Sequence, residues 1–216
     1  EIARAKTGFA VLNCICRQAM RILGQGCEKP EESCLCFDLA ADYVVDTGRG
    51  RRIDLKETLE ILHQADKAGL VLQPDNAKDP LFMCTCCGCC CGILRTLKRD
   101  PRPGKVASSP FLACFDVSKC NGCGLCTKRC PMEAIQLSEK KAVLNTDRCI
   151  GCGLCVSTCP TAALSLVRKP RSEQASIPKD HIRSVINVGR ARGKLGMGEL
   201  IRMQIKSKLD RLLAPK

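Results

Sequence analysis

The stretch "KCNGCGLCTKRCPMEAIQL" (Lys119–Leu137) decides the fold of its region, because it recurs 29 residues later as "RCIGCGLCVSTCPTAALSL" (Arg148–Leu166). Ten of the 19 positions are identical, and each copy has the spacing C-x2-C-x2-C-x3-C-P. Thiols at positions i, i+3 and i+6 wrap a short loop around a compact cluster, and the proline fixes φ as the chain leaves it. The repeat therefore predicts two similar metal sites whose assembly is coupled to folding.

The composition supports metal as the agent that holds the chain together. Of 216 residues, 20 are cysteines, whereas aromatic residues make up only 3%. Apart from its cysteines, such a chain has few large apolar side chains to form a hydrophobic core. Domains with small cores are often stabilised by disulfides or metals. The printed start has no signal segment, and no stretch reaches the roughly 18 apolar residues of a membrane span. We therefore expect a cytoplasmic protein whose thiols bind metal, because a reducing compartment disfavours disulfides.

Over Ala113–Arg168 the repeat closely resembles the bacterial two-cluster ferredoxin module. The resemblance implies two 4Fe-4S clusters, with the fourth cysteine of each copy binding the cluster of the other copy. One implied ligand set is Cys120, Cys123, Cys126 and Cys159, and the other is Cys149, Cys152, Cys155 and Cys130. Zinc is the alternative for C-x2-C pairs, but zinc sites seldom repeat this whole pattern. Each oxidised cluster carries about −2, so the clusters offset part of the formal charge of +13.

A second cysteine-rich stretch, "FMCTCCGCCCG" (Phe82–Gly92), precedes the repeat. Cys84, Cys87 and Cys90 share the C-x2-C-x2-C register of the repeat, and the other thiols fall outside it. Neighbouring side chains point in different directions, so we expect this ribbon to supply two sites together with cysteines nearer the N-terminus. The predicted metal ligands are Cys14, Cys16, Cys27, Cys34, Cys84, Cys86, Cys87, Cys89, Cys90 and Cys91. They predict one or two further iron–sulfur clusters, whereas Cys36 and Cys114 are interpreted as ordinary buried thiols.

This region also resembles the front half of uncharacterised multi-cluster iron–sulfur proteins that join a C-x-C-R element and a CCxCCC element to a ferredoxin module. The two "CCG" triplets, at Cys86–Gly88 and Cys90–Gly92, resemble those of heterodisulfide reductase subunits, which build clusters that act on disulfides. Those subunits separate their triplets widely, whereas here the triplets nearly overlap. A catalytic N-terminal cluster is therefore the less favoured alternative.

The expected fold class is α+β, with a ferredoxin-like module, a small and mostly helical cysteine-rich N-terminal domain and a C-terminal amphipathic helix. The expected parts are residues 1–97, a linker at 98–112, the ferredoxin module at 113–168 and a basic tail at 169–216. "LAADYVV" and "DLKETLEILHQADKAGLV" are expected helices, the latter capped by Asp54 and stopped at Gly69. Strands are expected in "AIQLSEKKAVLN" and "AALSLV". His63 is more typical of an exposed residue than of a ligand.

The tail has an apolar stripe at helical spacing beside basic residues. The stripe consists of Met197, Leu200, Ile201, Ile205, Leu209 and Leu212. It predicts a helix that packs on its own domain, docks a partner or lies on an acidic membrane surface.

These features favour a carrier that relays single electrons through several 4Fe-4S clusters as a subunit of an anaerobic oxidoreductase. The expected partners are redox protein subunits in a hetero-oligomer. A dinucleotide fingerprint, a phosphate-binding loop and a Ser/His/Asp set are all absent from the sequence. The alternatives are a reductase whose catalytic N-terminal cluster reduces a disulfide or small molecule and, as a minor alternative, a cluster-containing regulator that binds nucleic acid. Nucleic-acid binding is not expected, because the aromatic residues used for base stacking are scarce.

Overall fold

The computed structural model describes residues 1–213, apart from the side chains of Met197 and Arg211. Its chain divides into two compact units. The first contains residues 1–75 and 80–176, and the second contains residues 76–79 and the chain from Ile177 onward. Both cysteine-rich regions belong to the first unit, so they are parts of one structure.

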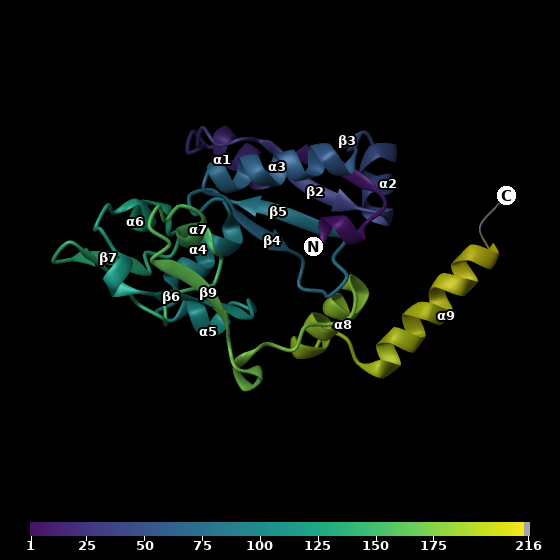
Figure 1. The fold of residues 1–216 in the computed structure, drawn as a ribbon. Coiled ribbons are helices and arrows are strands. Elements are labelled where there is room, and N and C mark those ends of the chain that lie inside the picture. Colours follow the sequence, from purple (N-terminus) through teal and green to yellow (C-terminus); the bar gives the residue numbers. More distant parts are fainter. Residues whose placement is uncertain (214–216) are drawn as a thin grey trace. The chain divides into compact units, whose positions relative to one another are not determined.

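The N-terminal part of the first unit is built on a five-stranded antiparallel sheet in the order β3-β1-β2-β5-β4 (Figure 1). Its strands are β1 (Phe9–Asn13), β2 (Glu32–Phe37), β3 (Gly50–Ile53), β4 (Val71–Pro74) and β5 (Phe82–Cys86). The helices of this part are η1 (Ala3–Ala5), α1 (Ile15–Ile22), α2 (Leu39–Asp46), α3 (Leu55–Lys67) and α4 (Gly92–Arg99).

The pleat of β1 sends alternate side chains to the two faces of this sheet. Phe9 and Val11 join the core under α3, whereas Ala10 packs with Ala41 and Val44 of α2. Both expected helices are present, and Asp54 caps α3 by accepting a hydrogen bond from the Glu57 amide at 2.7 Å. The description of this region as mostly helical was wrong, because it missed the sheet. Cysteines occupy alternate strand positions in "ESCLCF" and "FMCTC", and interpreting them only as ligands hid the period of two.

The C-terminal part of the first unit contains two short antiparallel sheets, β6–β9 and β7–β8. Its elements are α5 (Pro103–Val106), β6 (Phe111–Phe115), η2 (Val117–Lys119), α6 (Leu125–Arg129), β7 (Ile135–Ser138), β8 (Lys141–Leu144), α7 (Leu154–Ser157), β9 (Leu164–Arg168) and η3 (Arg171–Glu173). The segment interpreted as a linker therefore holds the end of α4, all of α5 and the start of β6. Gly104 within it is buried and donates a backbone hydrogen bond to Asp147 at 2.8 Å.

One apolar core joins the two parts of the first unit. Val71 and Leu94 from the N-terminal part pack in the same cluster as Met132, Ile150 and Leu164 from the C-terminal part. Cysteines of both parts also belong to this cluster. The mixture of helices and sheets confirms the expected α+β class.

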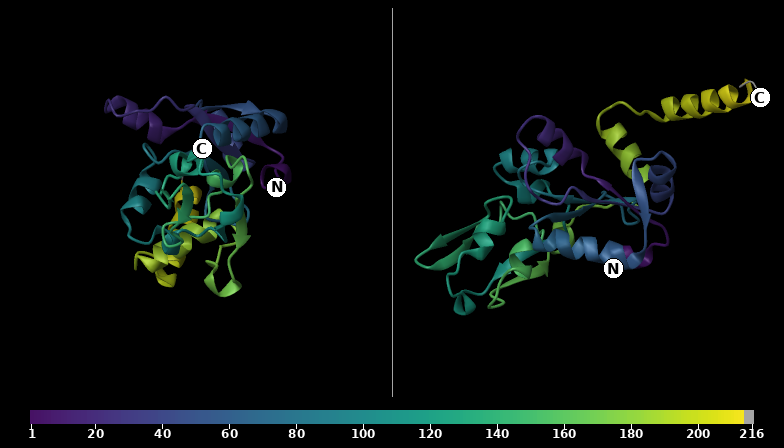
Figure 2. Two further views of the ribbon diagram at one scale, coloured as in Figure 1. Left: turned by 60° about the vertical axis from the view of Figure 1, so that its left-hand side comes forward. Right: turned by 90° about the horizontal axis from the view of Figure 1, so that it is seen from above.

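The second unit consists of α8 (His181–Ala191) and α9 (Met197–Leu213) with the short segment at residues 76–79. Asp79 forms a parallel bridge with Asp180, which caps α8 by accepting from the Arg183 amide at 2.8 Å. The helix predicted in the tail is present as α9, one continuous helix (Figure 2). Ile201, Ile205 and Leu209 are each more than half exposed, so the apolar stripe is not covered within its own unit. None of the described helices has the length and apolar character that crossing a membrane requires.

Candidate metal centres

The first cavity in the C-terminal part has an empty volume of about 320 Å³. The loop that precedes α6 contributes Cys120 and Cys123, the first turn of α6 contributes Cys126, and Cys159 enters from the other copy of the repeat. The rest of the lining is mainly apolar and includes Leu137. Four thiols that converge on one enclosed space form a donor set that suits a thiolate-bound metal.

The second cavity has an empty volume of about 340 Å³ and repeats this arrangement. Cys149 and Cys152 line it from the loop before α7, Cys155 lines it from α7 itself, and Cys130 enters from the first copy. Both crossed sets implied by the ferredoxin resemblance are therefore assembled around one cavity each. Metal ligation by these eight residues stays a prediction.

The backbone of each loop closely approaches another segment of the module at one glycine: the β7–β8 turn at Gly122, and β6 at Gly151. A Cβ atom at Gly122 would lie 2.2 Å from the Lys140 carbonyl oxygen, and one at Gly151 would lie 2.0 Å from that of Phe111. Both glycines also have positive φ. Only glycine meets both conditions, so the repeated glycine allows each cysteine loop to lie against its neighbouring segment.

The fourth cysteine of each copy is held by the same backbone contact. The amide of Ala134 donates to the Cys130 sulfur at 3.2 Å, and the amide of Ala163 donates to the Cys159 sulfur at 3.3 Å. Amide donors of this kind stabilise the negative charge of a thiolate and tune the reduction potential of a bound cluster.

Burial raises the pKa of Cys152 to about 11 and that of Cys155 to about 12. At neutral pH such thiols ionise only when a positive charge compensates them, and iron supplies that charge. The lining residues therefore fit an iron–sulfur cluster. When bound, a cluster of this type takes up and releases a single electron.

Residues 119–163 match the family of 4Fe-4S dicluster domains. These residues form an iron–sulfur ferredoxin module. Its role is electron transfer. No curated protein matches the chain.

Outside the ferredoxin module, a six-thiol group is formed by cysteines from β2, from β5 and from the N-terminal ends of α1 and α4. It consists of Cys14, Cys16, Cys34, Cys84, Cys86 and Cys91. Five of these thiols form a chain in which each thiol shifts the pKa of the next, in the order Cys14, Cys34, Cys84, Cys86, Cys91. Cys16 interacts electrostatically with three members of that chain.

The thiols of this chain alternate in acidity. A hydrogen bond with Cys34 lowers the pKa of Cys14 to about 6, and hydrogen bonds with Cys34 and then Cys86 lower that of Cys84 to about 3. The same contacts raise the pKa of Cys34 and of Cys86, which keep the shared protons. Adjacent thiols in the group therefore cannot all ionise without a compensating cation. This electrostatic demand is what a metal site satisfies.

Arg17 of α1 is the buried cation in this region, with 1% of its surface exposed. It donates to the Thr85 carbonyl oxygen at 2.9 Å, to the Thr85 hydroxyl at 3.3 Å and to the hydroxyl of Ser33. It also lies 3.9 Å from the Cys87 sulfur and interacts electrostatically with Cys14. In the sequence, Arg17 is only the last residue of the C-x-C-R element, because burial of a charge cannot be read from local spacing.

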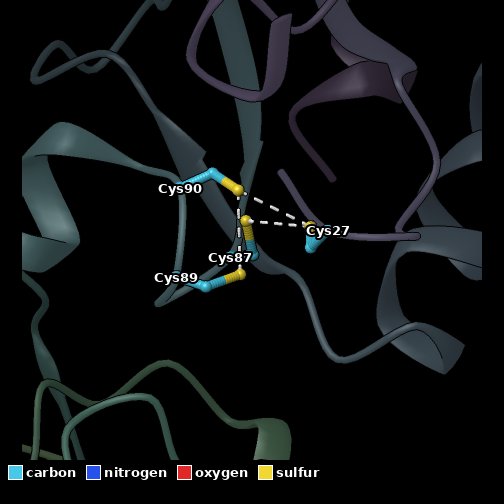
Figure 3. A group of neighbouring side chains, drawn as sticks. All are labelled: Cys27, Cys87, Cys89 and Cys90. Carbon is cyan, nitrogen blue, oxygen red and sulfur yellow. Dashed lines mark hydrogen bonds between the residues drawn. The ribbon is translucent and has the colours of Figure 1, made fainter. Parts of the chain in front are cut away.

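A four-thiol group is formed by Cys27, Cys87, Cys89 and Cys90 (Figure 3). Their sulfur atoms all lie within 4.8 Å of one another. Burial acts to raise the pKa of Cys87, but the Cys90 amide, the neighbouring thiols and Arg17 together lower it to about 7. Cys89 is exposed, whereas Cys87 and Cys90 are buried. All ten predicted N-terminal cysteines thus belong to one group or the other.

The shared C-x2-C-x2-C register of Cys84, Cys87 and Cys90 does not place the three thiols in one group. Cys87 and Cys90 belong to the four-thiol group, whereas Cys84 belongs to the six-thiol group. Cys84 and Cys86 lie two residues apart in β5, so the pleat gives them the same face. Cys87 follows the end of the strand and belongs to the four-thiol group with Cys90, whereas Cys91 returns to the six-thiol group. The expectation that the ribbon supplies two groups agrees with this arrangement, although ligation stays a prediction.

The remaining cysteines differ from each other. Cys36 of β2 is buried in the cluster that the sheet forms with α2, as expected of an ordinary thiol, and burial raises its pKa to about 11. Cys114 is exposed on β6, so its interpretation as a buried thiol was wrong. His63 is exposed, as expected.

Proposed function

We propose that the protein is an electron carrier that relays single electrons through several 4Fe-4S clusters as a subunit of an anaerobic oxidoreductase. Two clusters are assigned to the ferredoxin module, one to each cavity. The observation that carries this assignment is the crossed arrangement, in which three thiols from one copy and one from the other line each cavity. A module of this kind joins two redox sites through the chain itself.

A third cluster is assigned to the six-thiol group. Cys84, Cys86 and Cys91 of this group belong to the same apolar core as Cys126 and Cys155 of the ferredoxin module. Iron–sulfur sites that share a core are suited to pass electrons between them without crossing water. We infer that the N-terminal part extends the relay begun in the module.

The number of thiols favours a carrier over a reductase. A catalytic cluster keeps one iron free of protein ligands, so it needs fewer than four thiolates. The six-thiol group offers more than the four that a cubane cluster takes. Full ligation is the arrangement expected of a site that only exchanges electrons.

The electron donor and acceptor are proposed to be other redox subunits of a hetero-oligomer. Ile201, Ile205 and Leu209 of α9 form an uncovered apolar stripe on a chain with a formal charge of +13. Apolar contact combined with attraction to an acidic surface suits docking to a protein partner. A reducing compartment such as the cytoplasm is the setting in which so many thiols remain available for metal.

Iron and sulfide analysis of the anaerobically purified full chain tests the proposal, together with paramagnetic resonance of the reduced protein. Clusters in both cavities and in the six-thiol group predict about twelve irons per chain and magnetic coupling between reduced clusters. A value of about eight irons would restrict the relay to the ferredoxin module. Thiols oxidised in pairs, or a module that holds only zinc, would contradict the electron-transfer proposal itself.

A further inference from the structure

The four-thiol group differs from the ferredoxin sites in the distances between its sulfur atoms. The Cys27 sulfur lies 3.9 Å from that of Cys87 and 3.6 Å from that of Cys90, and the Cys90 sulfur lies 3.8 Å from that of Cys89. Figure 3 shows the four sulfurs turned toward one another. A tetrahedral ion with metal–sulfur bonds of about 2.3 Å places its ligand sulfurs about 3.8 Å apart. The three distances therefore match three of the six edges of one metal tetrahedron, and the other three sulfur–sulfur distances are at most 4.8 Å.

A 4Fe-4S cluster requires a wider arrangement. Its four thiolates bind four different irons, so the body of the cluster separates them. Within the described chain, residues 1–213, no other group of three or more cysteine, histidine or carboxylate ligands has all its atoms within 4.8 Å. Neither set of four ferredoxin cysteines meets this criterion, so the sulfur atoms that line each of the two cavities are spaced more widely. The two kinds of spacing point to two kinds of metal centre.

We propose that Cys27, Cys87, Cys89 and Cys90 bind a single zinc ion and do not hold an iron–sulfur cluster. A closed set of four cysteines in a tetrahedron is the usual structural zinc site. Zinc binds more tightly than ferrous iron in the general order of divalent metals. The site supplies four protein ligands, so it has no open position for a substrate.

The surroundings give this ion a structural role. Cys27 lies in the irregular segment between α1 and β2, and the other three cysteines lie between β5 and α4. One ion would tie together segments that are 60 residues apart in the chain. Cys87 and Cys90 are almost fully buried, with 1% and 2% of their surfaces exposed. Arg17 lies 3.9 Å from the Cys87 sulfur, where its charge offsets that of a thiolate-rich centre.

Elemental analysis and zinc-edge X-ray absorption of the anaerobically purified full chain test this assignment. We expect about one zinc per chain, surrounded by four sulfurs at about 2.3 Å with no iron neighbour. Absence of zinc from protein that is loaded with iron would overturn the proposal. A mononuclear iron centre in its place would overturn the choice of zinc.

Variants of the ligands separate this site from the iron–sulfur sites. Cys27→Ser is expected to lower the zinc content at least fivefold and to leave the iron content unchanged. Cys114→Ser, at an exposed thiol of the ferredoxin module outside both cavities, is the matched control and should change neither metal. Loss of about four irons from Cys27→Ser, with zinc unaffected, would show that the group holds a cluster.

A second variant tests the same site in case Cys27→Ser fails to fold. Cys89 is exposed, so Cys89→Ser removes a ligand with little change in packing. It should weaken zinc retention against a chelator at least tenfold while the ferredoxin signals in paramagnetic resonance persist. Retention equal to that of the unaltered chain would contradict the four-ligand site. The absorption spectrum of the unaltered chain decides the geometry even if both variants misfold.

Discussion

The ferredoxin module and the N-terminal part hold similar numbers of cysteines by different means. In the module, each loop presents three thiols at fixed spacing, and a fourth crosses from the other copy. In the N-terminal part, the thiols come from α1, β2, β5 and three connecting segments, and β5 holds Cys84 and Cys86 in a different group from Cys87, which follows the strand. The number of cysteines in a region therefore does not determine which kind of metal centre the region holds. The distances between sulfurs and the supply of buried charge decide it.

The largest expected effect comes from removing a crossing ligand of the module. Cys130→Ala deletes a thiol that lines the second cavity although it belongs to the first copy. We expect the loss of about four irons per chain and a large fall in thermal stability, because metal binding and folding are coupled. Iron analysis and thermal unfolding under anaerobic conditions measure both effects.

Cys114→Ala is the control for this substitution, since Cys114 is exposed and lines neither cavity. It should retain all the iron. Full iron content in Cys130→Ala would mean that the crossed arrangement is not used for ligation.

The next largest effect is expected from Arg17, the buried cation of the N-terminal part. Arg17→Met leaves the hydroxyls of Ser33 and Thr85 and the nearby thiols without their cation. Removal of one partner from a buried charged network costs about 3–5 kcal/mol in the free energy of unfolding. Denaturant titration of the holo protein measures this loss.

Arg21→Gln is the matched control on the same helix, where Arg21 is largely exposed and pairs with Glu31 at 2.6 Å. An exposed ion pair contributes about 0–1 kcal/mol. Equal losses in the two variants would show that Arg17 stabilises the protein only as an ordinary helix residue.

A smaller effect is expected where the N-terminal part meets the module. A Cβ atom at Gly88 would lie 3.2 Å from the Cβ of Pro131, next to the crossing residue Cys130. Gly88→Ala should therefore cost about 1–2 kcal/mol through overpacking. It should also shift the resonance signal of the module, because Pro131 lies in the lining of the second cavity.

Gly92→Ala is the matched control, because a Cβ atom at Gly92, the first residue of α4, would have no atom within 4 Å. It should stabilise the fold by about 0.4–1 kcal/mol by restricting the unfolded chain. If Gly88→Ala is as harmless as Gly92→Ala, the close approach of the two parts is not required.

The smallest effect is expected in the tail. Ile205 and Leu209 of α9 are more than half exposed, so replacing both with Ser should change the free energy of unfolding by less than about 0.5 kcal/mol per site. The same substitutions should weaken docking to a redox partner at least tenfold. Calorimetry and electron-transfer kinetics with the partner separate the two outcomes, and a marked fall in melting temperature would indicate that the stripe packs within the chain.

Prediction from sequence succeeded where structure depends on neighbours along the chain. The repeat placed two strands in "AIQLSEKKAVLN", which form β7 and β8, and the capping residue Asp54 placed the start of α3. It failed for the central sheet, because the cysteines in β2 and β5 hid the alternation of buried side chains. It also missed Arg17, since a buried charge depends on partners such as Ser33 that lie 16 residues away.

The sequence by itself determined the ferredoxin module, because a cluster-binding loop places three of its four thiols within seven consecutive residues. Only the tertiary structure decided how the ten N-terminal thiols divide into groups of six and four. Strand pleat and the pairing of distant segments set which sulfurs meet, as in the contact of Cys27 with Cys87 across 60 residues. The distances that follow from this packing, rather than the order of cysteines in the chain, distinguish a site for one ion from a site for a cluster.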